Sequence, residues 1–597
     1  MTSRLHILLA GAALWVLAGQ AAHAAEPKAQ IRGEIDAELR RKLEQAVGQV
    51  DAAPSSRFEA RRRARGAMEA AEALLRSEGY YQSALQDEVE GEDKPVAIIT
   101  VTPGRRFMLS DVHINWSAPP PDADTARATF EDIQLKPGEP GRAADVLAAE
   151  GRIVATLTRE GYADARAEPR RVVVDHASFT VQPNFNIASG ALVRLDGIQV
   201  RTRGPTNPDW VANLAPWTKG DRYDPEDVAE LERRLLDTGV YDGVGVSLAP
   251  IEETDAEGLR PVVVSLADRP RSLLEAGATY STAEGAGVDV FQTRYNRFGR
   301  AATLKYGGRF ASIDSRLGGE ASFPHWRRPG RTLKLSSYLV NEQTDAYDRS
   351  AITVSADLSQ RIGKTSYFTY GLGVDAGQYT EYRFDPVTQA PITFDRDLAI
   401  LTGRAIAFMD RSNDPLDPTR GFRLYVSAQP TAVAGEDTVL FLKTEGQATA
   451  YLPLQDGAKT VLAGRARIGS IIGGEELTVP SDRLFYSGGG GSVRGYSYQS
   501  INPRLPNNKP RGGLSLFETS LEVRRDIGEK FQAVAFVDAG AIGFQETPNL
   551  TNMRYGAGVG VRYKLPFGPV RADVAFPLNK REGDSGFQLY ISIGQAF

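Results

Sequence analysis

Period-two alternation of apolar and polar side chains is the feature that most constrains this chain. From about Ser272 onward, segments of about ten residues alternate in this way and are separated by turn-forming residues. The apolar face of the last segment comprises Phe587, Leu589, Ile591, Ile593 and Phe597, and its opposite face comprises Gln588, Tyr590, Ser592 and Gly594. This pattern predicts strands, which could belong to a soluble β-sandwich or to a transmembrane β-barrel.

The N-terminus favours the membrane alternative. Arg4 precedes a short apolar stretch from Leu8 to Leu17, and Ala22-His23-Ala24 has the small-x-small pattern of a cleavage site. Residues 1–24 are therefore predicted to be a secretory signal peptide, with the mature chain beginning near Ala25 outside the cytoplasm. No later segment approaches the roughly 18 apolar residues of a spanning helix, so a membrane form would have to be a closed barrel.

The length of the C-terminal region sets the expected size of this barrel. Residues 269–597 are predicted to form it, and the chain ends on an aromatic residue, Phe597. At roughly 20 residues for each strand and its connection, this length accommodates about 16 antiparallel strands.

The N-terminal half contains three similar units. Gly79, Gly161 and Gly239 are spaced by 82 and 78 residues, and each lies between a helical stretch and an extended stretch. A glycine in this position can end a helix with a positive φ angle. Each unit is therefore predicted to be an α+β module with an opening strand, two helices and two strands. The predicted modules are 25–105, 106–187 and 188–268.

Short joints between the modules predict a semi-rigid arm. An exposed sheet edge of such a module could accept an extended client strand by β-augmentation. The modules could equally serve only as spacers, and the sequence leaves both roles open.

Composition adds two expectations. A net charge of −5 gives no reason to expect a nucleic-acid partner, and the five scattered histidines with no cysteine predict no metal or other cofactor.

One glycine-rich segment interrupts the strand pattern. It consists of Gly488, Gly489, Gly490 and Gly491, followed by Ser492, Val493, Arg494, Gly495 and Tyr496. Because glycine loses the most backbone entropy on ordering, the run of four is unfavourable inside a helix or strand and predicts a loop. In isolation it would be an ordinary surface loop with a solvated arginine.

The segment resembles the loop-six motif of the outer-membrane assembly and translocation superfamily that includes BamA and TamA. Three further stretches, in order, resemble the mid-barrel, late-barrel and closing motifs of that superfamily: residues 410–421, 520–540 and 556–573. Three modules, called polypeptide-transport-associated (POTRA) domains in this superfamily, resemble the TamA branch, since BamA carries five and two-partner secretion transporters carry two.

The resemblance implies a specific anchor for the loop. The glycine run, Gly488, Gly489, Gly490 and Gly491, would act as a hinge, and Arg494 would dock in the barrel lumen on Asp538 and Glu522. A guanidinium can engage carboxylates bidentately, which fixes geometry as well as charge.

The resemblance also implies a non-enzymatic function at the bacterial outer membrane, with the modules in the periplasm. Unfolded outer-membrane or autotransporter clients would be captured by the modules and templated at a weak seam between the first and last strands. The expected seam strands are about Leu273–Tyr280 and Phe587–Phe597. Gly594 could weaken the last strand or could be an ordinary packing glycine. The expected partner is a long, inner-membrane-anchored TamB-like protein.

Three other function classes are compatible with parts of the sequence. A porin-like channel does not need the repeated modules, and a barrel-borne hydrolase would be expected to carry a G-x-S-x-G elbow, which we do not find. A two-partner secretion pore for one dedicated exoprotein is the strongest alternative, and module count separates it from the assembly factor.

Overall fold

The computed structural model describes residues 26–117, 119–281, 285–363, 365–385, 387–388, 390–435, 438–455, 457–565, 568–593 and 595–597. The predicted signal peptide and Gly594 lie outside these residues. The chain forms two compact units. Of the described residues, the first unit comprises those within 26–197, 217–228 and 248–261, and the second comprises those within 198–216, 229–247 and 262–597.

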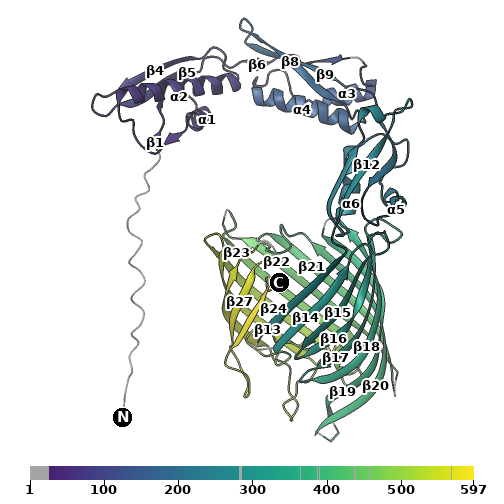
Figure 1. Ribbon diagram of the computed structural model, residues 1–597. Coiled ribbons are helices and arrows are strands. Elements are labelled where there is room, and N and C mark those ends of the chain that lie inside the picture. The colour runs from purple at the N-terminus through teal and green to yellow at the C-terminus, as the bar shows by residue number, and fades with distance from the viewer. Residues whose placement is uncertain are drawn as a thin grey trace, which may run out of the picture. The chain divides into compact units, whose positions relative to one another are not determined.

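The first small sheet has the predicted order of elements. Strand β2 (Gln30–Arg32) pairs in parallel with β5 (Val96–Thr102), which pairs with β4 (Ala84–Glu90). Helix α2 (Arg57–Ser77) runs along this sheet in Figure 1 and buries an alanine stripe with helical spacing. The remaining elements are α1 (Ala37–Val47) and the paired strands β1 (Glu26–Pro27) and β3 (Gln49–Val50).

The second small sheet repeats this arrangement. Helix α4 (Ala143–Arg159) ends before Gly161, whose φ of 94° lets the chain turn into the following strands. Tyr162 then packs in the module core. The other elements are β6 (Met108–Leu109), β7 (His113–Ser117), α3 (Ala123–Glu131), β8 (Arg166–Asp175) and β9 (Thr180–Ala188).

The third small sheet has the strand order β10, β12, β11, with residue ranges Arg194–Arg201, Leu259–Asp268 and Tyr241–Leu248. Its helices are α5 (Pro208–Ala212) and α6 (Pro225–Leu236), and a 3₁₀ turn spans Ile251–Glu253. Gly79 and Gly239 have φ angles of 94° and 70°, so all three repeated glycines have positive φ angles. The module boundaries drawn from the sequence remain predictions.

The C-terminal region forms a closed antiparallel barrel of 16 strands, β13 to β28, as the alternation predicted. The first eight strands are β13 (Ser272–Ser281), β14 (Gly285–Arg294), β15 (Thr303–Ala311), β16 (Asp314–Phe323), β17 (Arg331–Gln343), β18 (Tyr347–Ile362), β19 (Ser366–Asp385) and β20 (Ala390–Asp410). The last eight are β21 (Gly421–Ala434), β22 (Val439–Pro453), β23 (Thr460–Ile472), β24 (Ser515–Ile527), β25 (Phe531–Gly543), β26 (Arg554–Tyr563), β27 (Val570–Pro577) and β28 (Gln588–Ile593).

Side chains alternate across the barrel wall. Apolar residues such as Leu372 and Val559 are exposed on the outside, whereas charged residues such as Asp538 and Arg562 are buried. This is the arrangement expected of a barrel with a lipid-facing outer surface and a polar interior. None of the described helices is both long enough and apolar enough to cross a membrane.

The barrel closes between its first and last strands. Among the described residues, β13 and β28 are aligned at one Cα pair, Ser281 with Tyr590. Strand β13 is aligned with β14 at ten pairs, and β27 with β28 at six. These pairings close the sheet into a continuous wall.

The structure corrects the predicted end of the last strand. Strand β28 ends at Ile593, and Phe597 does not continue its lipid-facing row. The ring of Phe597 instead lies against the guanidinium groups of Arg465 and Arg524, at 5.5 and 5.3 Å from its centroid. Both arginines are buried, and cation–π attraction draws the terminal aromatic to them once the chain has left the strand.

Candidate functional site

The segment between β23 and β24, residues 473–514, is called loop six here. It contains one 3₁₀ turn, Ser481–Arg483, and then the glycine run. Val493, Arg494 and Tyr496 are all buried, so this part of the loop is not an ordinary solvated surface loop.

The four glycines of the run have different surroundings. Gly488 and Gly489 have φ angles of 111° and 107°, which most other residues would adopt only with strain. Gly490 and Gly491 lie outside this left-handed region. A Cβ on Gly490 would lie 3.0 Å from the Tyr590 ring, whereas one on Gly491 would meet no atom within 4 Å.

These differences refine the interpretation of the run as a uniform hinge. Backbone conformation requires glycine at Gly488 and Gly489, and close packing against the last strand favours it at Gly490. Neither reason applies to Gly491, which is exposed. The hinge role of the run as a whole remains a prediction.

Arg494 is held by two acidic side chains on neighbouring strands. Its Nε and Nη2 donate to the two carboxylate oxygens of Asp538, on β25, at 2.7 and 2.9 Å. Its Nη1 donates to Glu522, on β24, at 2.6 Å, and its backbone N–H donates to Asp538 at 3.0 Å. The structure thus brings together the three residues that the resemblance had paired.

Phe536 completes the immediate surroundings of the guanidinium. Its ring centroid lies 3.5 Å from the Arg494 Cζ, so the cation stacks on an aromatic face while its edges reach the carboxylates. Arginine suits this position because its planar charged group can stack and form bidentate hydrogen bonds at the same time.

Three further charged residues, which the motif comparison had not assigned, extend the anchor. Asp573, on β27, lies 3.5 Å from Arg494 Nη1 and also pairs with Arg562 on β26. Arg524, on β24, pairs with Glu522 at 2.9 Å. The only sequence signal for Arg562 and Asp573 was their presence in the closing motif.

These six residues form a balanced buried cluster of three arginines and three acids, called the lumen anchor here. Its members are Arg494, Arg524, Arg562, Glu522, Asp538 and Asp573, and none is more than 2% exposed. Removing one charge from a buried ion pair leaves its partner uncompensated, at a cost of about 3–5 kcal/mol. The cluster therefore holds loop six in one place because each charge depends on the others.

Two more glycines allow the loop backbone to approach the barrel wall. Gly495 has a φ of 99°, and a Cβ on it would lie 2.8 Å from the backbone of Phe576. Gly556, on β26, faces the carbonyl oxygen of Arg494 so closely that a Cβ there would overlap it. Glycine at both positions is required by close backbone contact.

The last strand also holds the loop. The hydroxyl of Tyr590 accepts from the Gly495 N–H at 3.2 Å and donates to the Tyr496 carbonyl at 3.0 Å. Gln588 donates to the Ser497 hydroxyl at 3.0 Å. Loop six is thus bonded directly to β28, one of the two seam strands.

The rest of the motif is anchored on neighbouring groups. The hydroxyl of Tyr496 lies within hydrogen-bond distance of two acceptors, the carbonyl of Tyr555 at 3.1 Å and the side-chain oxygen of Asn579 at 2.9 Å. Ser492 donates to the buried carboxylate of Glu518. Arg465 donates to the carbonyls of Gly491 and Ser492.

The last two predicted site residues differ. Phe597 lies at the edge of this arrangement, against Arg465, which donates to loop six, and against Arg524 of the lumen anchor. Gly594 lies outside the described residues.

The lumen anchor and its neighbouring hydrogen bonds hold loop six in position. The carboxylates and guanidinium groups of the anchor pair with one another, and their geometry holds a backbone segment in the lumen. Within the described part of the chain, no group of three or more His, Asp or Glu side chains is placed to hold a metal ion.

Comparison with known protein families gives two matches. The model of the Omp85 superfamily domain matches residues 296–597, which is half of the chain. The model described as POTRA domain TamA domain 1 matches residues 28–103.

Individual relatives are more distant. A protein named outer membrane protein assembly factor BamA from Nitratidesulfovibrio vulgaris is 24% identical over 531 residues, covering 85% of this chain and 64% of that protein. The chain thus spans just under two thirds of the length of this relative. The BamA of Neisseria meningitidis serogroup B is 22% identical, with 89% of this chain and 72% of that protein covered.

Among solved structures, BamA from Haemophilus ducreyi lacking POTRA domains 1–3 is similar with a TM-score of 0.65 and 19% identity. The match covers 81% of this chain and 99% of that structure. At this identity the likeness establishes the fold.

Proposed function

Because the chain belongs to the Omp85 superfamily, we propose that it is an assembly factor that inserts or secretes β-barrel or autotransporter-type clients. It is an outer-membrane β-barrel protein with periplasmic POTRA modules. In the proposed action, the modules receive an unfolded client, and the seam between β13 and β28 templates its strands.

The observation that carries this proposal is a loop that is held in the barrel lumen by the lumen anchor and is bonded to the last strand through Tyr590. Strands β13 and β28 are the two ends of the barrel sheet, so separating them would expose two strand edges. Exposed strand edges at an opened seam could pair with a client strand. The lumen anchor would keep the rest of the barrel wall in place while the seam opens.

The roles of the site residues follow from this action. Arg494 would fix loop six to β24 and β25 through Glu522 and Asp538. The glycine run would form the hinge of the loop, with Gly488 and Gly489 supplying the turn and Gly490 the close approach to β28. Phe597 would hold the end of the chain against the lumen arginines.

A TamA-type identity is the finer part of the proposal. It is supported by the match of residues 28–103 to the first POTRA domain of TamA and by the three sheets of three or four strands that precede the barrel in the described part of the chain. The corresponding partner would be an inner-membrane-anchored, TamB-like protein that contacts the POTRA modules.

The experiment that tests the function is client assembly by the full-length protein in lipid vesicles. Arg494→Ala should fold as a barrel, as judged by its faster migration on gels before heating, but should assemble an autotransporter-type client at least about tenfold more slowly. Arg494→Lys should recover little activity because lysine lacks the planar fork. Arg300→Ala, in the exposed turn after β14, is the control.

Two outcomes would reject the proposal. Wild-type assembly by Arg494→Ala would show that the anchor is not needed. Release of a soluble exoprotein, with no client inserted into the vesicle membrane, would favour a two-partner secretion pore.

A further inference from the structure

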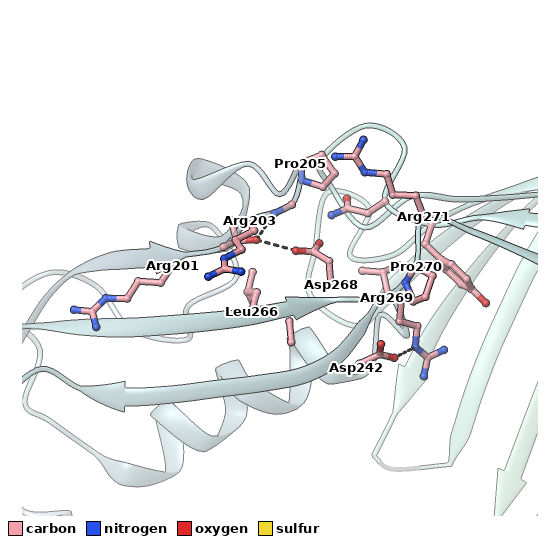
Figure 2. Close-up of a pocket in the computed structure, with 15 residues that line it drawn as sticks. Arg201, Arg203, Pro205, Asp242, Leu266, Asp268, Arg269, Pro270 and Arg271 are labelled. Atoms are coloured by element: carbon pink, nitrogen blue, oxygen red, sulfur yellow. Dashed lines mark hydrogen bonds and ion pairs between the residues drawn. The ribbon is translucent and has the colours of Figure 1, made fainter.

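A second feature of the molecule lies between the end of β12 and the start of β13. Within the second compact unit, a cavity of about 950 Å³ is lined by parts of β10, β11 and β12, by the connecting residues 269–271, and by the turn after β14. Figure 2 shows Arg203 and Asp268 close together at its wall, with Arg271 on the side of the barrel strands.

The side chains around this cavity carry an excess of positive charge. Arg201, Arg203, Arg269 and Arg271 line it, together with the two acids Asp242 and Asp268. Only one of these arginines has an ion pair among the described residues: Arg269 donates to Asp242 at 3.1 Å. The guanidinium of Arg201 points away from the cavity in Figure 2, which leaves Arg203 and Arg271 as the available cations.

Asp268 provides an unused acceptor in the same wall. One of its carboxylate oxygens accepts from the Thr202 hydroxyl at 2.8 Å. The other, Oδ1, is buried and has no hydrogen-bond partner in the described part of the chain. Gly204 makes room for this carboxylate, since a Cβ there would overlap it. A buried, unpaired carboxylate oxygen is costly, so a ligand that donates a hydrogen bond would be stabilised here.

The cavity adjoins the lipid-facing surface. Strand β13 begins at Ser272, directly after Arg271, and its outward-facing Leu274 is 70% exposed. Tyr295, which follows β14, also lines the cavity, and tyrosine is enriched at membrane–water interfaces. Arginine side chains are long enough to reach headgroups from the end of a membrane strand, and anionic headgroups attract such basic residues.

We propose that this cavity binds the headgroup of an anionic phospholipid of the phosphatidylglycerol class from the periplasmic leaflet. Arg203 and Arg271 contact the phosphate, and Asp268 Oδ1 accepts a hydrogen bond from a headgroup hydroxyl. The bound lipid ties the connection between β12 and β13 to the membrane at the base of the first seam strand. This site does not depend on the proposed assembly function, because it rests on a different set of residues.

The test compares lipid retention by the full-length protein in detergent. Native mass spectrometry is performed after adding equal amounts of phosphatidylglycerol and phosphatidylethanolamine. Wild type should retain phosphatidylglycerol preferentially, and the double variant Arg203→Gln/Arg271→Gln should bind it about 30-fold more weakly, the effect of two cations at a membrane surface. The double variant Arg61→Gln/Arg62→Gln removes two charges from α2 and should behave like wild type.

A second arm separates a lipid from a free phosphate. Glycerol 3-phosphate at millimolar concentration should not displace the lipid, because the acyl chains remain in the detergent micelle. Equal retention of the two phospholipids, or unchanged retention by Arg203→Gln/Arg271→Gln, would overturn the proposal. Complete displacement by glycerol 3-phosphate would overturn the lipid assignment.

A measurement on wild type avoids any folding defect of the variants. Photoactivatable phosphatidylglycerol in vesicles should cross-link to residues 201–205 or 269–271, as mapped by peptide sequencing. Cross-links found only on lipid-facing strand residues would reject the site.

Discussion

The phenol hydroxyl of Tyr590 bonds to the backbone of two consecutive residues in loop six. It accepts from the Gly495 N–H at 3.2 Å and donates to the Tyr496 carbonyl at 3.0 Å. Tyr590 belongs to β28, and its Cα is aligned with that of Ser281 on β13 across the seam. The same residue therefore contacts the loop that the lumen anchor holds and the edge at which the barrel closes. Displacing β28 should loosen the loop, and releasing the loop should loosen β28.

Tyr590→Phe tests this coupling. The ring remains, but the Gly495 N–H and the Tyr496 carbonyl lose their partner, at an expected cost of about 1–3 kcal/mol. Loop six should then leave the lumen more often, and trypsin should cleave after Arg494 at least about fivefold faster in folded, vesicle-embedded protein. Tyr563→Phe, on the exposed side of β26, is the matched control. Equal cleavage rates for the two variants would show that Tyr590 does not restrain the loop.

Gly556→Ala tests the close approach of loop six to β26. The new methyl group would overlap the Arg494 carbonyl oxygen, so the loop or the strand would have to move. Overpacking of this kind costs about 1–3 kcal/mol. The temperature at which the folded form is lost on gels should fall by several degrees. Gly464→Ala, on β23, has its nearest neighbour at 3.9 Å and should leave that temperature unchanged. Equal stability of both variants would contradict the contact.

Asp164→Asn tests a partly buried ion pair that joins the second and third small sheets within the first compact unit. Arg260 is buried and donates to both carboxylate oxygens of Asp164, at 3.0 and 2.6 Å. Because Asp164 is partly exposed, its loss should cost about 2 kcal/mol, less than for a fully buried pair. Hydrogen exchange at residues 189–193 should rise by roughly 30-fold. The exposed Asp111→Asn is the control, and similar exchange in both variants would mean that the pair does not stabilise this joint.

The surroundings of His325 predict that the local stability of the second unit depends on pH. It lies in the turn after β16, where its Nε2 donates to the Arg234 carbonyl at 2.8 Å and its Nδ1 accepts from the Gly330 N–H at 3.0 Å. This pattern requires the neutral ring. Burial lowers the pKa of His325, and the nearby charges of Arg234, Asp237 and Arg361 partly offset one another.

The direction of this pH dependence follows from the lowered pKa of His325. A histidine that is neutral in the folded state stabilises it fully above the unfolded pKa of about 6.5, and this contribution is lost as the pH falls through the folded pKa. Hydrogen exchange at residues 229–238 should therefore accelerate below about pH 6. His325→Gln should reduce this pH dependence, whereas the exposed His113→Gln should retain it. If the pH dependence of hydrogen exchange were the same in His325→Gln as in the wild type, another titrating group would be responsible for it.

The fold class was predictable because it depends on local and periodic properties. Alternation with period two defines strands wherever it occurs, and a glycine after each helical stretch ends that helix through a positive φ angle. The barrel region, its number of strands and the order of elements in the modules follow from such patterns. The pairing of Arg494 with Asp538 and Glu522 was accessible through motif resemblance, although these acids lie 44 and 28 positions away from the arginine.

For the glycine run, the local pattern predicted the type of structure but not its tertiary contacts. Its composition predicted a loop, and the positive φ angles of Gly488 and Gly489 agree with that. No sequence pattern indicated that Gly490 lies against the ring of Tyr590, a residue 100 positions further along the chain. Only the fold of the loop into the lumen brings this glycine and that strand together.

The remaining contacts depend on which distant residues the barrel brings together. Tyr590 and Asp573 are ordinary inward-facing strand residues in the sequence, and only strand register places them beside loop six. The position of Phe597 also could not be predicted locally. Continued alternation predicts that its ring faces lipid, but β28 ends at Ile593 and the ring lies against two buried arginines. Local periodicity thus determined the barrel and its modules, while closure of the sheet decided the anchor, because a closed barrel brings strands far apart in sequence around one shared interior.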